Sequence, residues 1–504
     1  MNTLVIGDGY NWIIDEIVDD YKKFTNHSMV SDNIELAWSV SMAHLPKLIN
    51  LNVPRVITIH HIDPLKVKEY QNTFDIINKY AAAVICPNKI TSEYAKQYIV
   101  KPIYTLPYWL LSKRKVNINE SQVEHLKKEI KIDNEIIIGY FQKDSEGSTN
   151  RPKLSKGPDV FLRIAIELNK RHNIKILLSG HSRDYLIENF KRKGIKYSFY
   201  PRYSNINDLY DVCDWYLVTS RTEGGPQSIL EAPYRNVKIL STRTGIAPEV
   251  LPEECLCSLP GDFVRKFEED KIPLESIKQN IIDNFIPEVV VPKYDVLLED
   301  IKKTSIINTV LSTVKHKNEN KGTTTLKFKK DVADILTSTN FDGDILEVGS
   351  HTGNTTLLLA TIAKQLHKKV VAFEISSDRI KEAKALIKLF NLEEHCTFIQ
   401  KDVYKESWDV NKFGCIFIDC VHYEANVKSD LDNALKVSNN NPIIFLHDYG
   451  LLIDKDSTSY LLERMKDKFN IVRYLGEEQN WNLLSSNKTI DWEGVQIECL
   501  KSTI

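Results

Sequence analysis

The sequence lacks the features that mark several large classes of protein. Its 504 residues include 66 Lys and Arg against 68 Asp and Glu, so the formal net charge is only −2. A nearly neutral chain with interspersed charges gives no electrostatic reason to bind nucleic acid or anionic lipid. The apolar runs are also short, and one of the longest, at 357–363, falls far below the ~18–20 residues that span a bilayer. We therefore expect neither a nucleic-acid partner nor a transmembrane segment.

The sequence also has no pair of CxxC motifs, and its first residues do not have the pattern that predicts a leader peptide. The eight cysteines form no pair of CxxC motifs, which structural zinc sites commonly use, and the closest spacing is that of Cys255 and Cys257. Scattered cysteines of this kind are typical of buried, reduced thiols in the cytosol. The first residues run directly into an apolar strand pattern at 4–6 without a basic leader. We expect no signal peptide and a cytoplasmic location.

What the chain does contain is an alternation of short β-branched runs and longer amphipathic stretches, with 42% apolar and 27% charged residues. This pattern is typical of parallel sheets covered by helices. Before residue 300, the sequence predicts two series of strands, one on each side of a charged helix at 120–131. The strands are expected at 4–6, 56–59, 83–86 and 103–106 before that helix, and at 136–140, 176–179, 197–200, 215–219 and 238–240 after it.

Length and local composition divide the chain into domains. At roughly 100–200 residues per domain, a chain of 504 residues corresponds to about three. A helical pattern near 275–312 is followed by a polar, charged segment at 315–322, which indicates a linker. A third strand–helix series begins at Ile345. We therefore predict an α/β protein with Rossmann-like domains at 1–118 and 119–312, a linker at 313–322, and a third Rossmann-like domain at 323–504.

The most informative stretch before residue 300 is E-G-G-P-Q-S-I-L-E, from Glu223 to Glu231. It follows the strand expected at 215–219, and its turn at Gly224 and Gly225 leads into a helix. Backbone amides at a helix start can bind an anion, while the two carboxylates can bind hydroxyl groups on either side of it. A nucleotide sugar presents this combination of hydroxyls and diphosphate. The simpler alternative is that both glutamates only cap the helix.

This stretch resembles the E-x7-E signature of the retaining glycosyltransferases of family 4, which have the GT-B fold of two Rossmann-like domains. The resemblance implies a donor site in which Glu223 contacts the sugar and Glu231 contacts the ribose of a nucleotide sugar. Lys156, in S-K-G-P-D, matches the family's lysine that neutralises the diphosphate, whose negative charge grows as the glycosidic bond breaks. The family's arginine precedes this lysine, and Arg151 and Lys143 are both candidates for its place.

Three N-terminal residues complete the donor site that the resemblance implies. His60, in T-I-H-H at a strand end, is similar to the family's histidine that faces the donor sugar, and strand ends are where α/β proteins bind ligands. Gly7 and Gly9 follow the first strand in a loop that can approach the phosphates. A structural histidine and a simple turn are the alternatives. The N-terminal domain is shorter than is usual in the family, which leaves acceptor recognition open.

The stretch I-L-E-V-G-S-H-T-G-N-T-T at 345–356 predicts a strand, a turn and a helix start. Gly349 and Gly353 let the backbone approach a ligand, and Glu347 at the strand end can bind an amine. The spacing E-x-G-x-x-x-G differs from the phosphate-binding fingerprints of dinucleotide-binding and P-loop proteins. It resembles motif I of the class I methyltransferases, which implies S-adenosylmethionine (SAM) as the cofactor.

Two later strand ends extend this resemblance. Glu374 ends the strand expected at 370–374, where the family holds the ribose of SAM. Asp402 follows a third strand and resembles the family's acidic residue near the adenine. The alternative is a generic Rossmann-like domain that does not bind SAM.

Four polar residues follow the next two strands. Asp419 and His422 lie in I-F-I-D-C-V-H, and His447 and Asp448 lie in I-I-F-L-H-D. Adjacent strand ends place them in one cleft, where carboxylates suit a hard divalent cation such as Mg²⁺ or Mn²⁺. The set resembles the metal-dependent sugar O-methyltransferases of macrolide tailoring. The resemblance implies Asp419 and Asp448 as metal ligands and His422 as the general base, with His447 as a further ligand where the family usually has a carboxylate.

Together these features predict a bifunctional enzyme of polysaccharide or glycoconjugate biosynthesis. One half transfers a sugar from a nucleotide-sugar donor to a glycan acceptor with retention, and the other O-methylates a glycan hydroxyl with SAM. The rival hypothesis is a methyltransferase acting on a small metabolite, with a degenerate glycosyltransferase half that only binds glycan. The sequence leaves open the donor, the acceptor, the methylated position, the order of the reactions and the oligomeric state.

Overall fold

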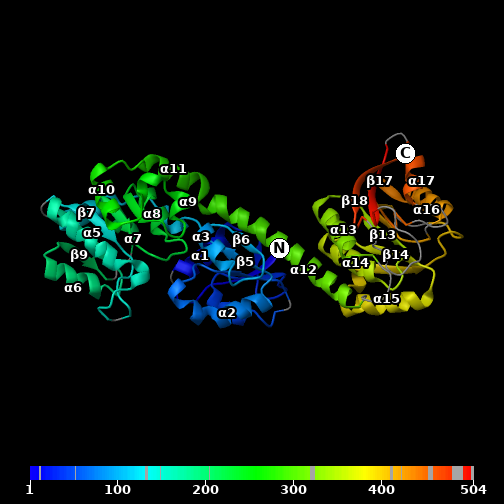
Figure 1. The fold of residues 1–504 in the computed structure, drawn as a ribbon, viewed down its shortest axis with the longest axis horizontal. Coiled ribbons are helices and arrows are strands. Elements are labelled where there is room, and N and C mark those ends of the chain that lie inside the picture. The colour runs from blue at the N-terminus through cyan, green and yellow to red at the C-terminus, as the bar shows by residue number, and fades with distance from the viewer. Residues whose placement is uncertain are drawn as a thin grey trace. The chain divides into compact units, whose positions relative to one another are not determined.

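The computed structural model divides by its tertiary contacts into two units, Met1–Lys302 and Lys303–Ile504, which are described one at a time (Figure 1). Among the described residues, no helix combines the length and the apolar character needed to cross a bilayer. The described residues are 1–10, 13–51, 53–130, 134–147, 149–201, 203, 205–317, 324–408, 412–421, 423–451, 458–478 and 492–500.

A six-stranded parallel sheet in the order β2-β1-β3-β4-β5-β6 forms the core of what we call the N-terminal domain. Its central strands are almost entirely buried on both faces, which explains why their sequences are short, continuous apolar runs. The strands are β1 (Asn2–Ile6), β2 (Ser28–Met29), β3 (Leu36–Ser39), β4 (Arg55–Thr58), β5 (Ala83–Cys86) and β6 (Ile103–Thr105). The helices are α1 (Ile13–Phe24), η1 (Met42–Lys47), η2 (Pro64–Lys66), α2 (Val67–Tyr80) and α3 (Lys89–Ala95).

A second parallel sheet, in the order β12-β11-β10-β7-β8-β9, forms the core of the middle domain. Helices α5, α6 and α10 pack on one face of this sheet, and α4, α7, α8, α9 and α11 pack on the other. The strands are β7 (Ile136–Tyr140), β8 (Ile174–Ser179), β9 (Tyr197–Tyr200), β10 (Trp215–Val218), β11 (Lys238–Thr242) and β12 (Leu256–Cys257). The helices are η3 (Ser112–Arg114), α4 (Glu120–Ile130), η4 (Leu154–Lys156), α5 (Pro158–Arg171), α6 (Asp184–Lys193), α7 (Ile206–Asp211), α8 (Ser228–Tyr234), α9 (Ala247–Val250), η5 (Glu253–Cys255), α10 (Pro260–Glu269) and α11 (Leu274–Asn284).

After the middle domain, the chain returns to the first sheet through α12 (Pro287–Lys317). Val290, Val291 and Tyr294 of this helix are fully buried in the core of the N-terminal domain. The ring of Tyr294 stacks on that of Trp38, with 5.1 Å between the centroids. Of the linker expected at 313–322, residues 313–317 belong to α12, and 318–322 lie outside the described residues.

The second unit, which we call the C-terminal domain, is built on a seven-stranded sheet in the order β15-β14-β13-β16-β17-β19-β18. The first five strands in sequence are parallel, and the strand order reverses at β13 and β16, where α/β proteins of this kind bind ligands. Helices α13, α14 and α15 pack on one face, and α16 and α17 on the other. The strands are β13 (Asp344–Val348), β14 (Val370–Glu374), β15 (Cys396–Gln400), β16 (Phe413–Ile418), β17 (Ser438–His447), β18 (Phe469–Leu475) and β19 (Gly494–Cys499), and the helices are α13 (Leu326–Ser338), α14 (Asn354–Gln365), α15 (Ser377–Leu389), η6 (Glu393–His395), α16 (Glu424–Lys436) and α17 (Thr458–Arg464).

The fold class predicted from the sequence is confirmed, because the first two sheets are parallel and the third has five parallel strands, all of Rossmann-like α/β type. Each expected strand is present within a few residues of its expected bounds. The sequence patterns did not predict β2, β3 and β12, or the antiparallel strands β18 and β19 that complete the third sheet.

Candidate active sites

A cavity of about 550 Å³ lies between the N-terminal and middle domains of the first unit. The N-terminal domain contributes residues that follow β4 and β5, and the middle domain contributes residues that follow β10 and β11. The cavity therefore opens at the carboxyl ends of strands from both sheets, where side chains for ligand binding gather in α/β proteins. Its lining includes His61, Lys89, Tyr94, Arg221, Glu223 and Arg243.

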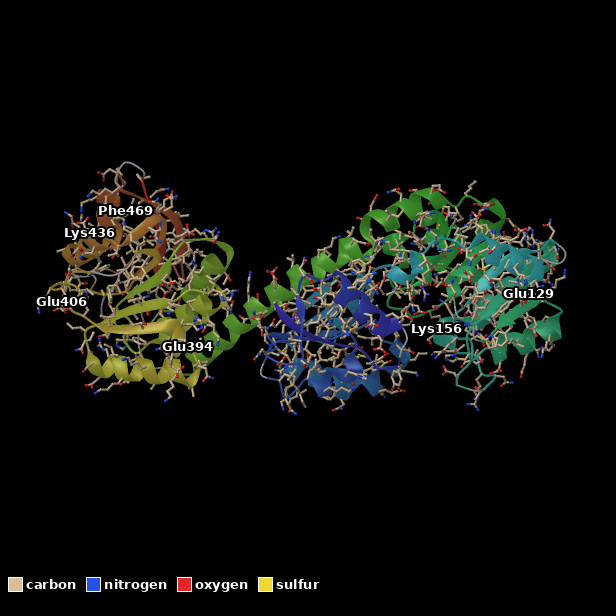
Figure 2. All side chains as sticks on the ribbon, turned by 180° about the vertical axis from the view of Figure 1, so that it is seen from behind. Glu129, Lys156, Glu394, Glu406, Lys436 and Phe469 are labelled. Atoms are coloured by element: carbon tan, nitrogen blue, oxygen red, sulfur yellow. The ribbon has the colours of Figure 1, made fainter. Side chains whose placement is uncertain are left out.

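Lys156 and Glu223, the two residues expected at the reacting end of a donor, form an ion pair at this cavity. Lys156 Nζ lies 2.6 Å from Glu223 Oε1, and Ser220 Oγ donates to the same oxygen at 2.8 Å. Lys156 lies on the side of the middle domain that faces the N-terminal domain (Figure 2). Its backbone is fixed because the Tyr140 hydroxyl donates to the Lys156 carbonyl at 2.9 Å. The pair is thus held in place by the ends of two adjacent strands, β7 and β10.

Gly224 of the middle domain packs closely against the N-terminal domain. A Cβ at this position would overlap the carbonyl group of His60, so only glycine fits. Asn88 of the N-terminal domain donates to the Gly224 carbonyl at 2.5 Å. Gly225, by contrast, has open space around it. Of the two glycines, Gly224 therefore allows the two domains to pack closely, and Gly225 has space around it.

Glu231 is bound by side chains of the protein itself. It is 4% exposed, and its two carboxylate oxygens accept hydrogen bonds from Arg114 Nε at 2.7 Å and from the Tyr210 hydroxyl at 2.8 Å. Arg114 lies on η3, between the first and second sheets, and is also 3.9 Å from Glu16 of α1. The structure thus places Glu231 in an ion pair behind the cavity, and it is not one of the residues that line it.

The two adjacent histidines after β4 point to different surroundings. His60 Nε2 donates to the Val40 carbonyl at 2.6 Å, its ring stacks on Tyr108, and burial lowers the pKa of His60 to about 4. His61 lines the cavity, and burial lowers its pKa, although the charge of Glu223 acts in the opposite direction. The histidine that faces Glu223 is therefore His61, which the sequence reasoning did not select. The motif T-I-H-H indicates a histidine at the donor site, but it does not show whether His60 or His61 is that residue.

The remaining expected donor residues lie in loops. The Gly9 N–H donates to Asp15 Oδ1 at 3.0 Å, and a Cβ at Gly7 would overlap the same carboxylate, so Asp15 fixes this turn at the start of α1. Arg151 is exposed, and its carbonyl accepts from the Glu146 N–H at 3.0 Å. Lys143 is partly buried, and burial lowers its pKa, as do the positive charges of Lys153, Lys156 and Arg183.

The C-terminal domain contains a second cavity of about 660 Å³ at the carboxyl ends of its parallel strands. It brings together the cofactor and metal residues that the sequence predicted after five successive strands, except Gly353 and His422. Gly353 is the residue before α14, and His422 lies outside the described residues. The predicted residues in the lining are Glu347, Gly349, Glu374, Asp402, Asp419, His447 and Asp448.

The turn after β13 contains two glycines that let the backbone pass close to the cavity. Gly349 and Gly353 have φ values of +94° and +87°, which residues other than glycine rarely adopt. A Cβ at Gly349 would overlap the Asp419 carbonyl, and one at Gly353 would lie 2.7 Å from the Ala383 side chain. Ser350, which lines the cavity, has a buried hydroxyl that finds no hydrogen-bond partner among the described residues. An unsatisfied hydroxyl at the floor of a cavity fits a polar ligand group.

The two glutamates at the ends of β13 and β14 differ in their environment. Glu347 is 1% exposed and accepts a hydrogen bond from Thr356 Oγ1 at 2.5 Å. Burial, with the nearby charge of Asp419, raises the pKa of Glu347 to about 8. Glu374 instead accepts from the backbone N–H groups of His351 and Ser376, both at 2.9 Å. These contacts hold the Glu374 carboxylate at the rim of the same cavity.

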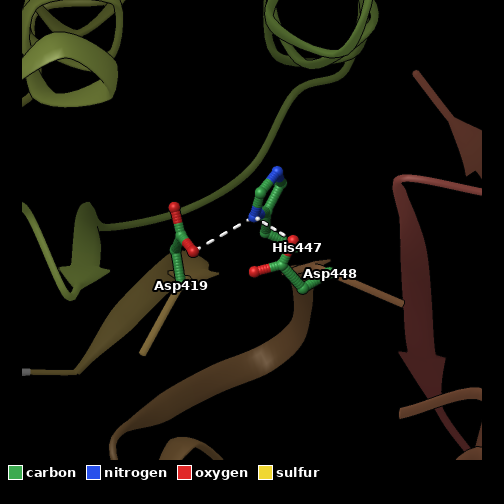
Figure 3. Close-up of side chains that lie close together, drawn as sticks. All are labelled: Asp419, His447 and Asp448. Atoms are coloured by element: carbon green, nitrogen blue, oxygen red, sulfur yellow. Dashed lines mark hydrogen bonds and ion pairs between the residues drawn. The ribbon is translucent and has the colours of Figure 1, made fainter. Parts of the chain in front are cut away.

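Asp419, His447 and Asp448 converge at the ends of β16 and β17 (Figure 3). One ligand atom from each lies within 4.8 Å of the others. His447 Nδ1 is 3.1 Å from Asp419 Oδ1 and 3.3 Å from Asp448 Oδ1. Burial alone would lower the pKa of His447, but the charges of the two aspartates outweigh it and hold the pKa well above 6.5. Two carboxylate oxygens and one imidazole nitrogen form a donor set that suits a divalent cation.

Two further charged residues of this site were missed by the sequence reasoning. Glu493 is completely buried, and its Oε1 lies 3.3 Å from His447 Nε2. Lys329 of α13 is 2% exposed, and burial lowers its pKa to about 8 despite the charges of Glu493, Asp419 and Glu347. Glu493 immediately precedes β19, which is antiparallel to β17, so the start of this strand lies at the edge where the parallel strands end. A search limited to the ends of parallel strands cannot find it.

Comparisons with known proteins give one family match within each of the two units. A family model described as "Glycosyl transferases group 1" matches residues 148–255, and one described as "Methyltransferase domain" matches residues 346–449. No curated protein matches the chain.

Several solved structures are similar to parts of the chain. Anabaena HepE, solved with UDP and glucose, is 14% identical with a TM-score of 0.48, covering 59% of this chain and 98% of that one. A variant of S. aureus TarM, solved with fondaparinux, α-GlcNAc-glycerol and UDP, is 15% identical with a TM-score of 0.42, covering 52% of this chain and 55% of that one. A SAM-dependent O-methyltransferase from Thermotoga maritima is 13% identical with a TM-score of 0.28, covering 38% of this chain and 70% of that one. From the two family matches and the folds that contain them, the chain is an enzyme with a group 1 glycosyltransferase domain and a methyltransferase domain.

Proposed function

We propose that the first unit transfers a sugar from a nucleotide-sugar donor to a glycan acceptor with retention, and that the second uses SAM to O-methylate a glycan hydroxyl. The observation that carries the first half is the Lys156–Glu223 ion pair at the cavity between the two domains. The observation that carries the second is the cavity that joins Glu347, Glu374 and the Asp419–His447–Asp448 cluster.

In the donor site, Lys156 binds the diphosphate and stabilises the charge that grows on it as the glycosidic bond breaks. Glu223, released from its ion pair, binds hydroxyls of the donor sugar. We assign the second cation to Lys143 rather than Arg151, because Lys143 has Lys156 among its electrostatic neighbours. The turn at Gly7 and Gly9 and the turn at Gly224 and Gly225 let the backbone approach the donor. His60 supports the N-terminal side of the site through its hydrogen bond to the Val40 carbonyl.

In the methyltransferase site, the residues present fit SAM. Glu347 would bind the amine of its methionine part, the Gly349–Gly353 turn would pass close beneath it, and Glu374 and Asp402 would bind the ribose and lie near the adenine. SAM supplies an electrophilic methyl group when it is bound. The unsatisfied Ser350 hydroxyl supports a polar ligand at this turn.

A divalent cation, Mg²⁺ or Mn²⁺, completes this proposal. Asp419, His447 and Asp448 would hold it, and a cation at that place lowers the pKa of an acceptor hydroxyl. His422, three residues after Asp419, would accept the proton of that hydroxyl as general base. The eight cysteines are all free thiols, which supports a reducing compartment, and we place both reactions in the cytoplasm.

A second candidate is favoured by the contacts of Glu231. Each of its oxygens already accepts a hydrogen bond, from Arg114 or Tyr210, and Glu231 is buried and does not line the cavity, so a donor ribose reaches it only if this region rearranges. If that rearrangement does not occur, the first unit binds glycan without turnover and serves as an anchor for the methyltransferase. In that case the methyltransferase substrate is the bound glycan or a small metabolite.

The test of glycosyl transfer uses a panel of nucleotide sugars and measures the release of nucleoside diphosphate. We expect one donor to be consumed, with rates about 10²–10³-fold lower for Glu223→Gln and Lys156→Ala. The exposed Glu254→Gln in the same domain is the matched control and keeps the parent rate. Equal rates in all four proteins would reject the donor site, whereas binding without release would favour the glycan-binding module.

The test of methyl transfer follows the formation of S-adenosylhomocysteine with the glycosylated product as acceptor. Chelation should stop the reaction and Mg²⁺ or Mn²⁺ should restore it. His422→Ala should lose about 10²–10⁴-fold in rate while it still binds SAM. Full activity in EDTA would assign the two aspartates to structure or to direct substrate binding.

A further inference from the structure

The second ring nitrogen of His447 faces a carboxylate that the proposed methyl transfer does not use. Nδ1 points to Asp419 and Asp448, as Figure 3 shows, while Nε2 lies 3.3 Å from Glu493 Oε1. Glu493 is completely buried, so it cannot reach solvent, and His447 is 8% exposed. The imidazole thus bridges a buried carboxylate on one side and, on the other, two carboxylates that line the cavity.

Glu493 is held in a fixed orientation by groups from two segments, at Thr325 and at 476–477. Its Oε1 accepts from the Thr325 N–H at 2.5 Å, and its Oε2 accepts from the Thr325 hydroxyl and, at 3.4 Å, from the Glu477 N–H. Gly476 has a φ of +79°, and a Cβ there would lie 2.8 Å from the Glu493 Cβ, so a glycine is needed beside this side chain. Every contact constrains the carboxylate, which leaves Oε1 aimed at the imidazole.

Thr325 also connects this carboxylate to the helix that covers His447. Its hydroxyl accepts from the Phe328 N–H at 3.1 Å and so caps α13. The Phe328 ring packs edge-on against the His447 ring, with 5.1 Å between the centroids. The rotation of the imidazole is therefore limited on its face by Phe328 and at Nε2 by Glu493.

A carboxylate that binds the Nε2–H of a histidine fixes the ring and leaves Nδ1 as the nitrogen available to a cation, which would take the place of the Nδ1 proton. Histidines that bind metals generally have such a partner, which sets both the tautomer and the ring orientation. Here Nδ1 is the nitrogen that faces the two aspartates. The geometry points to the Glu493 carboxylate as the group that orients His447.

We propose that Glu493, held by Thr325, is a positioning residue that fixes His447 with Nδ1 toward a divalent cation shared with Asp419 and Asp448. This inference rests on the proposed cation site. The cation is recognised by oxygen and imidazole donors, and Glu493 acts on it only through His447. A merely structural buried ion pair would affect the unfolding temperature but would leave cation affinity unchanged.

The experiment measures Mn²⁺ binding to the full chain by electron paramagnetic resonance in the absence of acceptor, so that activity is not the readout. We expect the parent to bind Mn²⁺ and Asp419→Asn to lose that binding, which assigns the signal to this site. Glu493→Gln should raise the Kd for Mn²⁺ about 10- to 100-fold. The matched control is Glu498→Gln, an exposed glutamate on the adjoining strand, and it should bind Mn²⁺ like the parent.

A second pair of variants covers the case in which Glu493→Gln does not fold. Thr325→Val removes the hydroxyl that holds Glu493 and should weaken Mn²⁺ binding, whereas Thr325→Ser keeps the hydroxyl and should restore it. SAM binding to each variant shows that the cofactor cavity is intact. If the parent binds Mn²⁺ and neither Glu493→Gln nor Thr325→Val weakens it, the positioning role is wrong and the cation site stands. If the parent does not bind Mn²⁺ at this site, the cation site itself is wrong.

Discussion

Glu347 has an unusual protonation equilibrium for a residue proposed to bind a positively charged amine. Burial raises its pKa from the usual 4.5 to about 8, so the carboxyl group is largely protonated at neutral pH when the cavity is empty. A bound amine would favour the ionised form, because an opposite charge at close range lowers the pKa of an acid. Cofactor binding should therefore release a proton.

The same equilibrium predicts how the stability of the C-terminal domain depends on pH. Between about pH 4.5 and pH 8 the unfolded chain loses the Glu347 proton while the folded chain keeps it, so stability falls as pH rises, by about 5 kcal/mol for this group. Glu347→Gln has the same shape but no ionisation, so we expect the variant to unfold at a higher temperature than the parent near pH 8 and at the same temperature near pH 5. Thermal unfolding across this pH range checks the prediction, and parallel curves for the two proteins would contradict it.

At the scale of single elements, two glycines offer a matched comparison. Gly157 and Gly194 both follow helical turns in the middle domain and have φ values of +65° and +63°. A Cβ at Gly157 would overlap the Thr219 carbonyl, whereas one at Gly194 would have nothing within 4 Å. The two positions share their backbone conformation and differ in the space around it.

We expect Gly194→Ala to cost only about 1–2 kcal/mol, the strain of an alanine in the left-handed region. Gly157→Ala carries the same strain and also pushes the end of β10 away from Lys156, so it should separate Lys156 from Glu223 and abolish donor binding. Thermal unfolding and calorimetric titration with the donor nucleoside diphosphate measure both effects. Retained nucleotide binding in Gly157→Ala would show that the loop can move without harm to the site.

Most elements could be predicted because buried parallel strands leave a clear pattern of short apolar runs between helices. The strands at 83–86, 136–140, 197–200 and 370–374 coincide with their expected bounds. The antiparallel strand β18 could not be found this way, because most of its residues are not buried and its apolar run is broken.

Site residues could be predicted from the sequence where they lie at the ends of parallel strands, because those strands could be predicted. Glu347, Asp419 and Asp448 follow parallel strands and meet at one cavity. Glu493 and Lys329 come from the start of an antiparallel strand and from a helix face, for which the sequence has no comparable pattern. The choice between His60 and His61 depends on the direction of each side chain after β4, which a motif of two adjacent histidines does not encode.

At the scale of the whole molecule, the second unit has a complete sheet with a hydrophobic core on each face. We therefore expect a fragment of residues 303–504 to fold and to bind SAM. A fragment that starts at 322 should be less stable by about 2 kcal/mol, because it lacks Ile307, which is buried in the core with Phe328. Calorimetric SAM titration and thermal unfolding of both fragments check this, and insolubility of the 303–504 fragment beside a stable full chain would show that the division of the chain is wrong.

The return of α12 to the first sheet has a consequence for how the protein is made. Tyr294 stacks on Trp38, so the core of the N-terminal domain contains residues that are far apart along the chain and separated by the whole middle domain. Synthesis delivers the chain from its N-terminus, at about 5–20 residues per second. The first sheet must therefore wait on the ribosome, with the Trp38 face uncovered, for tens of seconds by that rate. During that interval the middle domain has all of its strands available, and the domain that is translated first is the one whose core is completed later.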